Sequence, residues 1–460
     1  MQNKSKRYLK HTPYVPYDNS CYTYVMSEGG AISSFVGGGV TPYEYTGWED
    51  ECLSWHENCF IHAGLNPTTT SIVKGPDALK LFSDNSVNSY NNFKIGRSKH
   101  VIMCDENGKI VIHGVCQRLA EDEFRTYWLS PWVDFLLSTG DYNASVENIT
   151  GETFLYQLGG PRSLEVIENA CQEDLHDIRF LGFKDTIIAG KKVTVYRIGM
   201  CGTLAYEVHG LTEDCLDVYD ALLKAGEAFG IRKLGRNAYR VVHTEGGFPQ
   251  IFYHFPFAMW DGLMEYVGAQ EDIYGLAPFA FSGSAADLPY PEQLRSPIEV
   301  GWSHMVKFDH DFTGKDALEK EMENPKRTMV TLEWNHDDLL DIYRSQFSKE
   351  DACSTMKWSE DFDFYLGSSN FHIDKVLNQE DDLIGLASGR LFSPYYREMI
   401  SLCSIDIAYA NIGTEVTVLW GEVGTKQKKI RAKVARFPYI DKNRNEDVNT
   451  DSIPRLNINK

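Results

Sequence analysis

Four side chains stand in surroundings where they could do chemistry. Glu207 lies in LAYEVHG, an apolar run typical of a strand, where a carboxylate is costly to bury unless hydrogen-bond donors meet it. His113, in GKIVIHGV, has an ordinary pKa near neutrality and can take up or release a proton. Trp128 and Trp132, in EDEFRTYWLSPW, can wall a pocket for a flat ligand. Each also has a plainer interpretation: an outward-facing glutamate, a buried histidine and packed tryptophans.

Several other chemistries find no support in the sequence. The ten cysteines are scattered from Cys21 to Cys403 without a CxxC pair or a Cys/His cluster of zinc spacing. The glycines of residues 29–39 lack the Lys-Ser/Thr that would complete a phosphate loop, and no GxGxxG follows a strand. The sequence therefore predicts neither a metal site nor a nucleotide or flavin fingerprint.

Length and charge narrow the class of protein further. A chain of 460 residues predicts two or three domains. Its 65 acidic against 45 basic residues give a net charge of -20, which disfavours a nucleic-acid partner. No run of 18 apolar residues exists, and no apolar run follows the basic N-terminus, so neither a membrane partner nor export is expected. We predict a cytoplasmic protein; the sequence leaves its oligomeric state open.

The elements that must position these side chains follow an α+β pattern over about the first 280 residues. Residues 70–86 and 154–171 each read as strand, turn and helix, with a proline opening the helix. Residues 100–129 read as an antiparallel meander around a hairpin turn at 105–108. Residues 212–230 form an amphipathic helix. Beyond residue 327 the strand-like segments predict a β-barrel or sandwich of roughly 110 residues.

Four segments in this order resemble the glycine-cleavage T-protein aminomethyltransferase superfamily. They are VKGPDALKLFSD, GGPRSLEVIE, YRIGMCGTLAYEVHG, and the C-terminal SGRLFSP, IGTEVTVLWG and AKVARFPY. Three more are similar to the tetrahydrofolate-dependent aryl O-demethylase branch, which includes vanillate and syringate demethylases: MVKFDHDFTGKDALE, MVTLEWNHDDLLDIYRSQF and GRNAY. The resemblance implies a three-domain cloverleaf around a central channel for tetrahydrofolate, with a small-molecule methyl donor beside it.

The resemblance also suggests domain limits. Residues 1–285 would form the folate-binding α+β region, as two intertwined subdomains, 50–150 and 1–49 plus 151–285. Residues 286–326 would connect this region to a C-terminal β domain, 327–460, of barrel or jelly-roll type.

Four residues are implied as cofactor contacts. Glu207 matches the family's pterin-binding glutamate, whose two oxygens can accept hydrogen bonds from the edge of the ring. The family's glutamine before the helix turn is Gly159 here, which leaves Gln157 two residues earlier to serve. Tyr206 and Arg236 complete this predicted set.

Three residues are implied as catalytic. Tyr239 falls on the tyrosine that meets the phenolate leaving group in the aryl demethylases, and its ordinary pKa, about 10, is close to that of a phenol. His113 replaces the Asp that the demethylases keep, and it could take the proton lost by the alkylated amine. The demethylases' histidine pair becomes Asn66 and Pro67 here, and nearby His62 is predicted to compensate.

The substrate pocket is predicted from Leu129, Trp128, Trp132 and Asn66. Leu129 stands where demethylases of benzoate-type substrates use an arginine, so a donor without a carboxylate is expected. The leading hypothesis is a tetrahydrofolate-dependent O-demethylase acting on a methoxy-aromatic. The alternatives are a one-carbon transferase using an amine, sulfonium or methylenedioxy donor, and a non-catalytic folate-binding regulatory protein.

Overall fold

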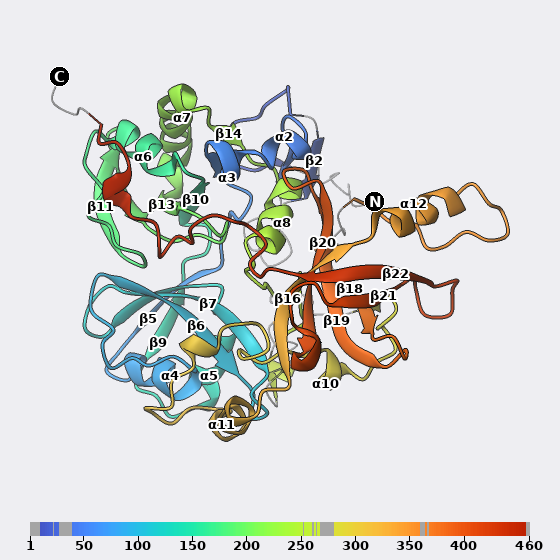
Figure 1. Ribbon diagram of the computed structural model, residues 1–460. Coiled ribbons are helices and arrows are strands. Elements are labelled where there is room, and N and C mark those ends of the chain that lie inside the picture. Colours follow the sequence, from blue (N-terminus) through green and yellow to red (C-terminus); the bar gives the residue numbers. More distant parts are fainter. Residues whose placement is uncertain are drawn as a thin grey trace, which may run out of the picture.

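Three lobes meet around one central helix in the computed structural model (Figure 1). The structure describes residues 10–21, 23–26, 39–251, 253–259, 262–263, 265–266, 280–358, 364–365 and 368–456. A six-stranded sheet forms the upper left lobe, a five-stranded sheet the lower left lobe, and a barrel the right lobe. Within the described residues, no helix combines the length and apolarity needed to cross a membrane.

The upper left lobe is a sheet covered by two helices. Its strand order is β11 (Phe183–Ile188), β12 (Lys191–Tyr196), β13 (Ala205–Leu211), β10 (Thr153–Gly159), β4 (Phe60–His62) and β14 (Arg232–Lys233). Helices α6 (Ser163–Cys171) and α7 (Cys215–Gly226) bury their apolar stripes against it, including Leu164, Ile167, Val218 and Leu222. These two helices were predicted from the sequence, in the strand–turn–helix unit of residues 154–171 and the amphipathic helix of residues 212–230.

The lower left lobe contains the predicted meander. Strands β6 (Arg97–Cys104), β7 (Ile110–Arg118), β8 (Glu123–Tyr127), β5 (Thr70–Lys74) and β9 (Ser145–Asn148) lie in this order. Helices α4 (Ala78–Asn85) and α5 (Trp132–Thr139) belong to the same lobe. The segment 286–326, with α10 (Tyr290–Gln293), η3 (Ser303–Met305) and α11 (Lys315–Glu323), adds Ile298, Val300, Trp302 and Leu318 to its core.

The right lobe confirms the predicted C-terminal β-barrel. Strands β18 (Ser368–Leu377), β19 (Leu383–Ser393), β20 (Glu398–Asp406), β16 (Arg327–Trp334), β22 (Lys428–Ala435) and β21 (Glu415–Trp420) follow one another, and pairing of β21 with β18 closes the ring. Strands β15 (Ala280–Ser282) and β17 (Phe364–Tyr365) pair with β18, and α12 (His336–Ser345) follows β16.

Helix α8 (Arg236–Glu245) lies between the lobes, and every one of its residues is buried. A small sheet of β1 (Lys10–His11), β3 (Gly39–Glu44) and β2 (Thr23–Met26) precedes the short helices α2 (Trp48–Glu51) and α3 (Ser54–Glu57). The remaining short elements are η1 (Thr212–Asp214), η2 (Glu227–Phe229), η4 (Ile407–Tyr409) and η5 (Thr450–Ser452).

The chain leaves the barrel after β22 and returns to the upper left lobe (Figure 1). Asn445 Nδ2 donates to the Ala205 carbonyl at 2.9 Å, and Arg197 Nη2 donates to the Val448 carbonyl at 2.7 Å. The hydroxyl of Thr450 donates to the His176 carbonyl at 3.1 Å. These hydrogen bonds fasten residues 445–450 to the upper left lobe, although they follow the barrel strands in the chain.

Candidate active site

A cavity of about 1020 Å³ lies where the three lobes meet. This volume is at the upper end of the range for small-molecule sites. Strands of both left-hand lobes, helix α8, the segment 300–307 and the chain after β22 all supply lining residues. Five of the residues predicted from the sequence line it: Tyr239, His113, Glu207, Gln157 and Trp128.

Glu207 is held by two neighbours in the upper left lobe. Antiparallel pairing of β10 with β13 sets Gln157 directly opposite Glu207, and its Nε2 donates to Glu207 Oε1 at 3.0 Å. His209 lies two residues along the same face of β13, and its Nε2 is 3.0 Å from Glu207 Oε2. The carboxylate is thus fixed in place with further acceptor capacity on both oxygens.

A hydrogen-bond chain extends behind this carboxylate. Tyr127 Oη lies 2.7 Å from His209 Nδ1. Burial lowers the pKa of His209 although the Glu207 carboxylate favours its charged form, so the ring is neutral near pH 7. Because a carboxylate only accepts, Nε2 of the neutral ring carries the hydrogen and Tyr127 donates to Nδ1. The chain Tyr127–His209–Glu207 therefore orients the carboxylate.

Tyr239 extends from α8 into the cavity lining with 2% of its surface exposed. His62 stacks on its ring at 4.1 Å between centroids and 8° between planes. His243, one helical turn later, meets the same ring edge-on at 4.9 Å. Nδ1 of His62 lies 2.9 Å from the Leu234 carbonyl oxygen. This contact holds the imidazole in place, and the stacked imidazole in turn holds the Tyr239 ring.

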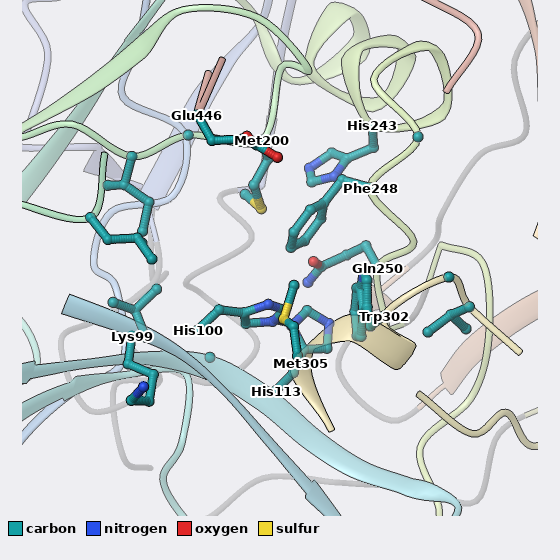
Figure 2. Close-up of a pocket in the computed structure, with 18 of the residues that line it drawn as sticks. Lys99, His100, His113, Met200, His243, Phe248, Gln250, Trp302, Met305 and Glu446 are labelled. Carbon is teal, nitrogen blue, oxygen red and sulfur yellow. Dashed lines mark hydrogen bonds between the residues drawn. The ribbon is translucent and has the colours of Figure 1, made fainter. Parts of the chain in front are cut away.

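His113 lies on β7 in the lower left lobe, beside a second histidine. Its Nδ1 is 3.1 Å from Nε2 of His100 on β6. Figure 2 shows both rings next to Trp302 and Met305, with Phe248 on the side toward α8. Burial, reinforced by nearby His100 and His243, holds the pKa of His113 well below its usual range. This ring is therefore neutral near pH 7.

Four residues predicted for the pocket or the cofactor do not line this cavity. Tyr206 alternates with Glu207 along β13 and so points into the core of the upper left lobe. Leu129 and Trp132 are packed in the core of the lower left lobe. Arg236 is buried at the start of α8.

The side chain of Asn66 hydrogen-bonds to backbone atoms and does not line the cavity. Its Nδ2 donates to the carbonyls of Leu155 and Ala63 at 2.7 and 3.0 Å, and its Oδ1 accepts from Leu155 N at 2.8 Å. This buried amide therefore fastens the turn after β4 to β10.

We expect Asn66→Ala to lower the free energy of unfolding by about 2–3 kcal/mol, because the Leu155 backbone N–H and carbonyl lose buried partners. Urea denaturation measures this change. Asn107→Ala in the exposed hairpin turn is the control, with an expected change within about 0.5 kcal/mol. Unchanged stability with a lost ligand affinity would contradict this structural role.

Several lining residues were missed by sequence reasoning. They are His100, Tyr127, His243, Phe248, Trp302 and Met305. His209, which does not line the cavity but hydrogen-bonds to Glu207 and Tyr127, was missed as well. His209 could have been found, because a residue two positions from Glu207 shares its strand face. Trp302 and Met305 carried no local signal, since only the tertiary packing of segment 286–326 brings them to the cavity.

Comparison with known proteins assigns the family. Residues 22–253 match the GCVT N-terminal domain model. Sesamin methylene transferase of Sinomonas sp. (strain No.22) is 40% identical over 93% of this chain and 96% of its own length. Syringate O-demethylase of Sphingobium sp. (strain NBRC 103272 / SYK-6) is 31% identical over 86% of this chain and 89% of its own. The chain belongs to the glycine-cleavage T-protein superfamily.

The fold of a solved T-protein agrees with that assignment. The crystal structure of glycine cleavage system aminomethyltransferase T from Bartonella henselae covers 91% of this chain and 96% of its own, with a TM-score of 0.61 at 17% identity. Because the relatives above include an O-demethylase and a methylene transferase, the predicted demethylase branch is confirmed, and the protein is an enzyme. The hypothesis of a non-catalytic regulatory protein is therefore not retained.

Tetrahydrofolate is the cofactor of this superfamily, as predicted, and the cavity fits it. The Glu207 carboxylate, positioned by Gln157 and His209, can accept hydrogen bonds from the donor-rich edge of a pterin. Aromatic and apolar side chains wall the space beyond it. Lys307 and Arg444 line the same cavity and offer positive charge to the carboxylates of a glutamate tail.

Proposed function

We propose that this enzyme moves the ether carbon of an uncharged aromatic donor to tetrahydrofolate and releases a phenol. The observation that supports this best is the placement of Glu207, Tyr239 and neutral His113 around one aromatic-walled cavity of about 1020 Å³. Glu207 and Gln157 would hold the pterin, and Tyr239 and His113 would serve the reacting groups. Bound tetrahydrofolate supplies the nucleophilic amine N5.

Tyr239 is proposed to protonate the departing oxygen. A phenolate is a poor leaving group unless a hydrogen bond or a proton meets its charge. A tyrosine hydroxyl has nearly the same affinity for a proton as the departing phenol, so the transfer costs little. The stacked His62 and edge-on His243 hold the tyrosine ring in one orientation, which reduces the entropy lost on reaching the transition state.

The surroundings of His113 support an uncharged donor. Trp302 and Phe248 contact its ring with centroids 5.0 and 5.9 Å away. Burial lowers the pKa of His100 to about 4, so neither histidine offers a positive charge to a carboxylate near pH 7. A carboxylate placed there would lose its hydration without a partner. This argument replaces the one from Leu129, which lies in the core.

Two kinds of aryl ether meet these requirements. A methoxy-aromatic would yield 5-methyltetrahydrofolate, the product of the leading sequence hypothesis. A methylenedioxy-aromatic would yield 5,10-methylenetetrahydrofolate and a catechol, because both of its C–O bonds break. The second kind is favoured by the higher identity with sesamin methylene transferase, 40% against 31% for syringate O-demethylase.

A donor panel distinguishes these possibilities. Anaerobic enzyme with tetrahydrofolate is incubated with 2-methoxyphenol, 1,3-benzodioxole or 3-methoxybenzoate, and the folate products are measured by mass spectrometry. We expect turnover of an uncharged donor at least tenfold above the benzoate, since burying the unpaired carboxylate costs about 1–3 kcal/mol or more. 5-Methyltetrahydrofolate is heavier than tetrahydrofolate by one CH2 group. 5,10-Methylenetetrahydrofolate has two hydrogens fewer than the methylated product, so the two masses distinguish them.

Trimethylsulfonium and dimethylglycine complete the panel as representatives of the other donor classes. One-carbon transfer from either of these, with no product from any aryl ether, would contradict the proposed function. Faster turnover of the benzoate would contradict the uncharged donor alone.

A further inference from the structure

Two imidazoles are joined in series on the sheet that borders the cavity. Strand pairing sets Ile102 opposite His113, so His100 lies diagonally across on the same face. The bond of 3.1 Å joins His100 Nε2 to His113 Nδ1. The other nitrogen of His113, Nε2, is buried and has no hydrogen-bond partner among the described residues, although the side chain lines the cavity.

A third histidine lines the same cavity and is exposed to solvent. This residue, His304 on η3, lies near enough to His100 to disfavour its charged form. The order from the inside outward is therefore His113, His100, His304. Of the three, His113 is buried, His100 is partly exposed and His304 is exposed.

The other surroundings of the pair are mainly aromatic. Phe248, Phe255 and Trp302 contact the His113 ring, and Phe248 and Trp302 also contact His100. His243 on α8 is a further titratable group near enough to His113 to disfavour its charged form. The ammonium of Lys99, next to His100 in sequence, lies over the rings of Tyr90 and Phe93 and so points elsewhere.

Neutral rings joined in this way have two possible arrangements. If His100 donates from Nε2, His113 must carry its own hydrogen on Nε2 and presents a donor to the cavity. If His113 donates from Nδ1, its Nε2 presents a lone pair and can accept a proton. The partner on one nitrogen thus decides the chemistry of the other.

We propose that His100 is a positioning residue, which accepts from His113 Nδ1 so that His113 Nε2 faces the cavity as a base. It also passes the proton on toward His304 and solvent. This inference rests on the proposed function, in which the attacking amine loses a hydrogen. Because burial makes an imidazolium costly here, passing the proton along the pair avoids storing charge on either ring.

The proton balance closes. His113 Nε2 takes the proton that the amine gives up as its N–C bond forms and the ether C–O bond breaks. His113 Nδ1 gives its own hydrogen to His100 Nε2, and His100 Nδ1 releases one toward His304. The electron pair of the broken bond stays on the phenolate oxygen, which takes a proton from Tyr239. Solvent reprotonates Tyr239, so one proton enters and one leaves.

The first test reads the tautomers without any turnover. Full-length protein labelled with ¹⁵N-histidine is examined by NMR between pH 6 and 8, and the signals are assigned with His100→Gln and His304→Gln. We expect hydrogen on Nδ1 and a lone pair on Nε2 in both His113 and His100. In His100→Phe, His113 should change to the form with hydrogen on Nε2. Hydrogen on His113 Nε2 in the unmodified protein would overturn the proposal.

The second test measures single-turnover rates with the uncharged aryl ether. His100→Phe should react about ten- to a hundredfold more slowly, the range for loss of general-base assistance, with tetrahydrofolate affinity changed less than twofold. His100→Gln, which hydrogen-bonds but does not relay protons, should lose a similar factor. A rate within twofold of the unmodified enzyme in both variants would overturn the proposal.

The release of the proton to solvent through His304 is tested separately. His304→Gln should slow the single turnover a few-fold, and added imidazole buffer should restore the rate. The matched control is His336→Gln, at an exposed histidine of the barrel paired with Glu398, which should change nothing. Loss without rescue by imidazole would overturn the exit through His304. Absence of aryl-ether turnover in the unmodified enzyme would refute the proposed function, and the tautomer measurement would still decide the role of His100.

Discussion

Replacing Tyr239 by phenylalanine is expected to lower kcat about a hundred- to a thousandfold while tetrahydrofolate affinity changes less than twofold. The variant keeps the ring that stacks on His62 and meets His243, so the packing of α8 is preserved. It removes only the hydroxyl that we propose to protonate the departing phenolate. Stopped-flow or quenched turnover with an uncharged aryl ether measures kcat, and titration calorimetry measures the affinity.

The dependence on the leaving group sharpens this experiment. More acidic phenols leave without help, so the loss caused by Tyr239→Phe should shrink steadily along a series of donors of increasing phenol acidity. An equal loss for every donor would show that the hydroxyl acts elsewhere. Tyr142→Phe, which removes a half-buried hydroxyl outside the cavity, is the matched control and should leave kcat unchanged.

Glu207→Gln is expected to weaken tetrahydrofolate binding about a hundredfold, equivalent to about 3 kcal/mol. The amide is nearly the same size, so Gln157 and His209 retain a partner of similar shape. It lacks the charge that strengthens two hydrogen bonds from a pterin edge, and one of its two polar groups is a donor. Anaerobic calorimetric titration gives the dissociation constant for each protein.

A pterin that lacks the 2-amino group separates a direct contact from a general loss of fold. This analogue should bind the unmodified enzyme more weakly than tetrahydrofolate but should lose little further affinity in Glu207→Gln, because the two changes remove one interaction. Additive losses would contradict the contact. Glu333→Gln, on a barrel strand where the glutamate accepts from Tyr439 at 2.7 Å, is the matched control and should bind normally.

Helices and strands were predicted well where the segment itself contains turn residues or a periodic apolar pattern. The hairpin turn of residues 105–108, the helix after Pro161 and the strands beyond residue 327 all contain turn or periodic residues that state their structure directly. The path of segment 286–326 had no such signal. Its apolar residues look like those of any loop, and they complete the lower left core only through tertiary contacts.

The site divides in a similar way. Glu207, Gln157, Tyr239 and His113 were found by resemblance, and the structure brings them to one cavity. Leu129 and Asn66 also came from matching family positions, and Tyr206 and Trp132 were added beside the matched segments. Strand alternation, core packing and backbone hydrogen bonds turn these four side chains away from the cavity. His100 was missed because its partner lies across a strand pair, and that register becomes known only when the sheet is formed.

The returning tail after β22 means that the barrel is not an exchangeable module. Phe437, Pro438, Arg444 and Glu446 line the cavity while Asn445 and Val448 are bound to the opposite lobe. A chimera that carried the barrel and C-terminal segment of a relative would pair that segment with an upper left lobe to which it is not matched. A chimera without the segment would leave this surface of the lobe uncovered. Recombination among such enzymes should therefore succeed when residues 436–456 are inherited together with the lobe that receives them.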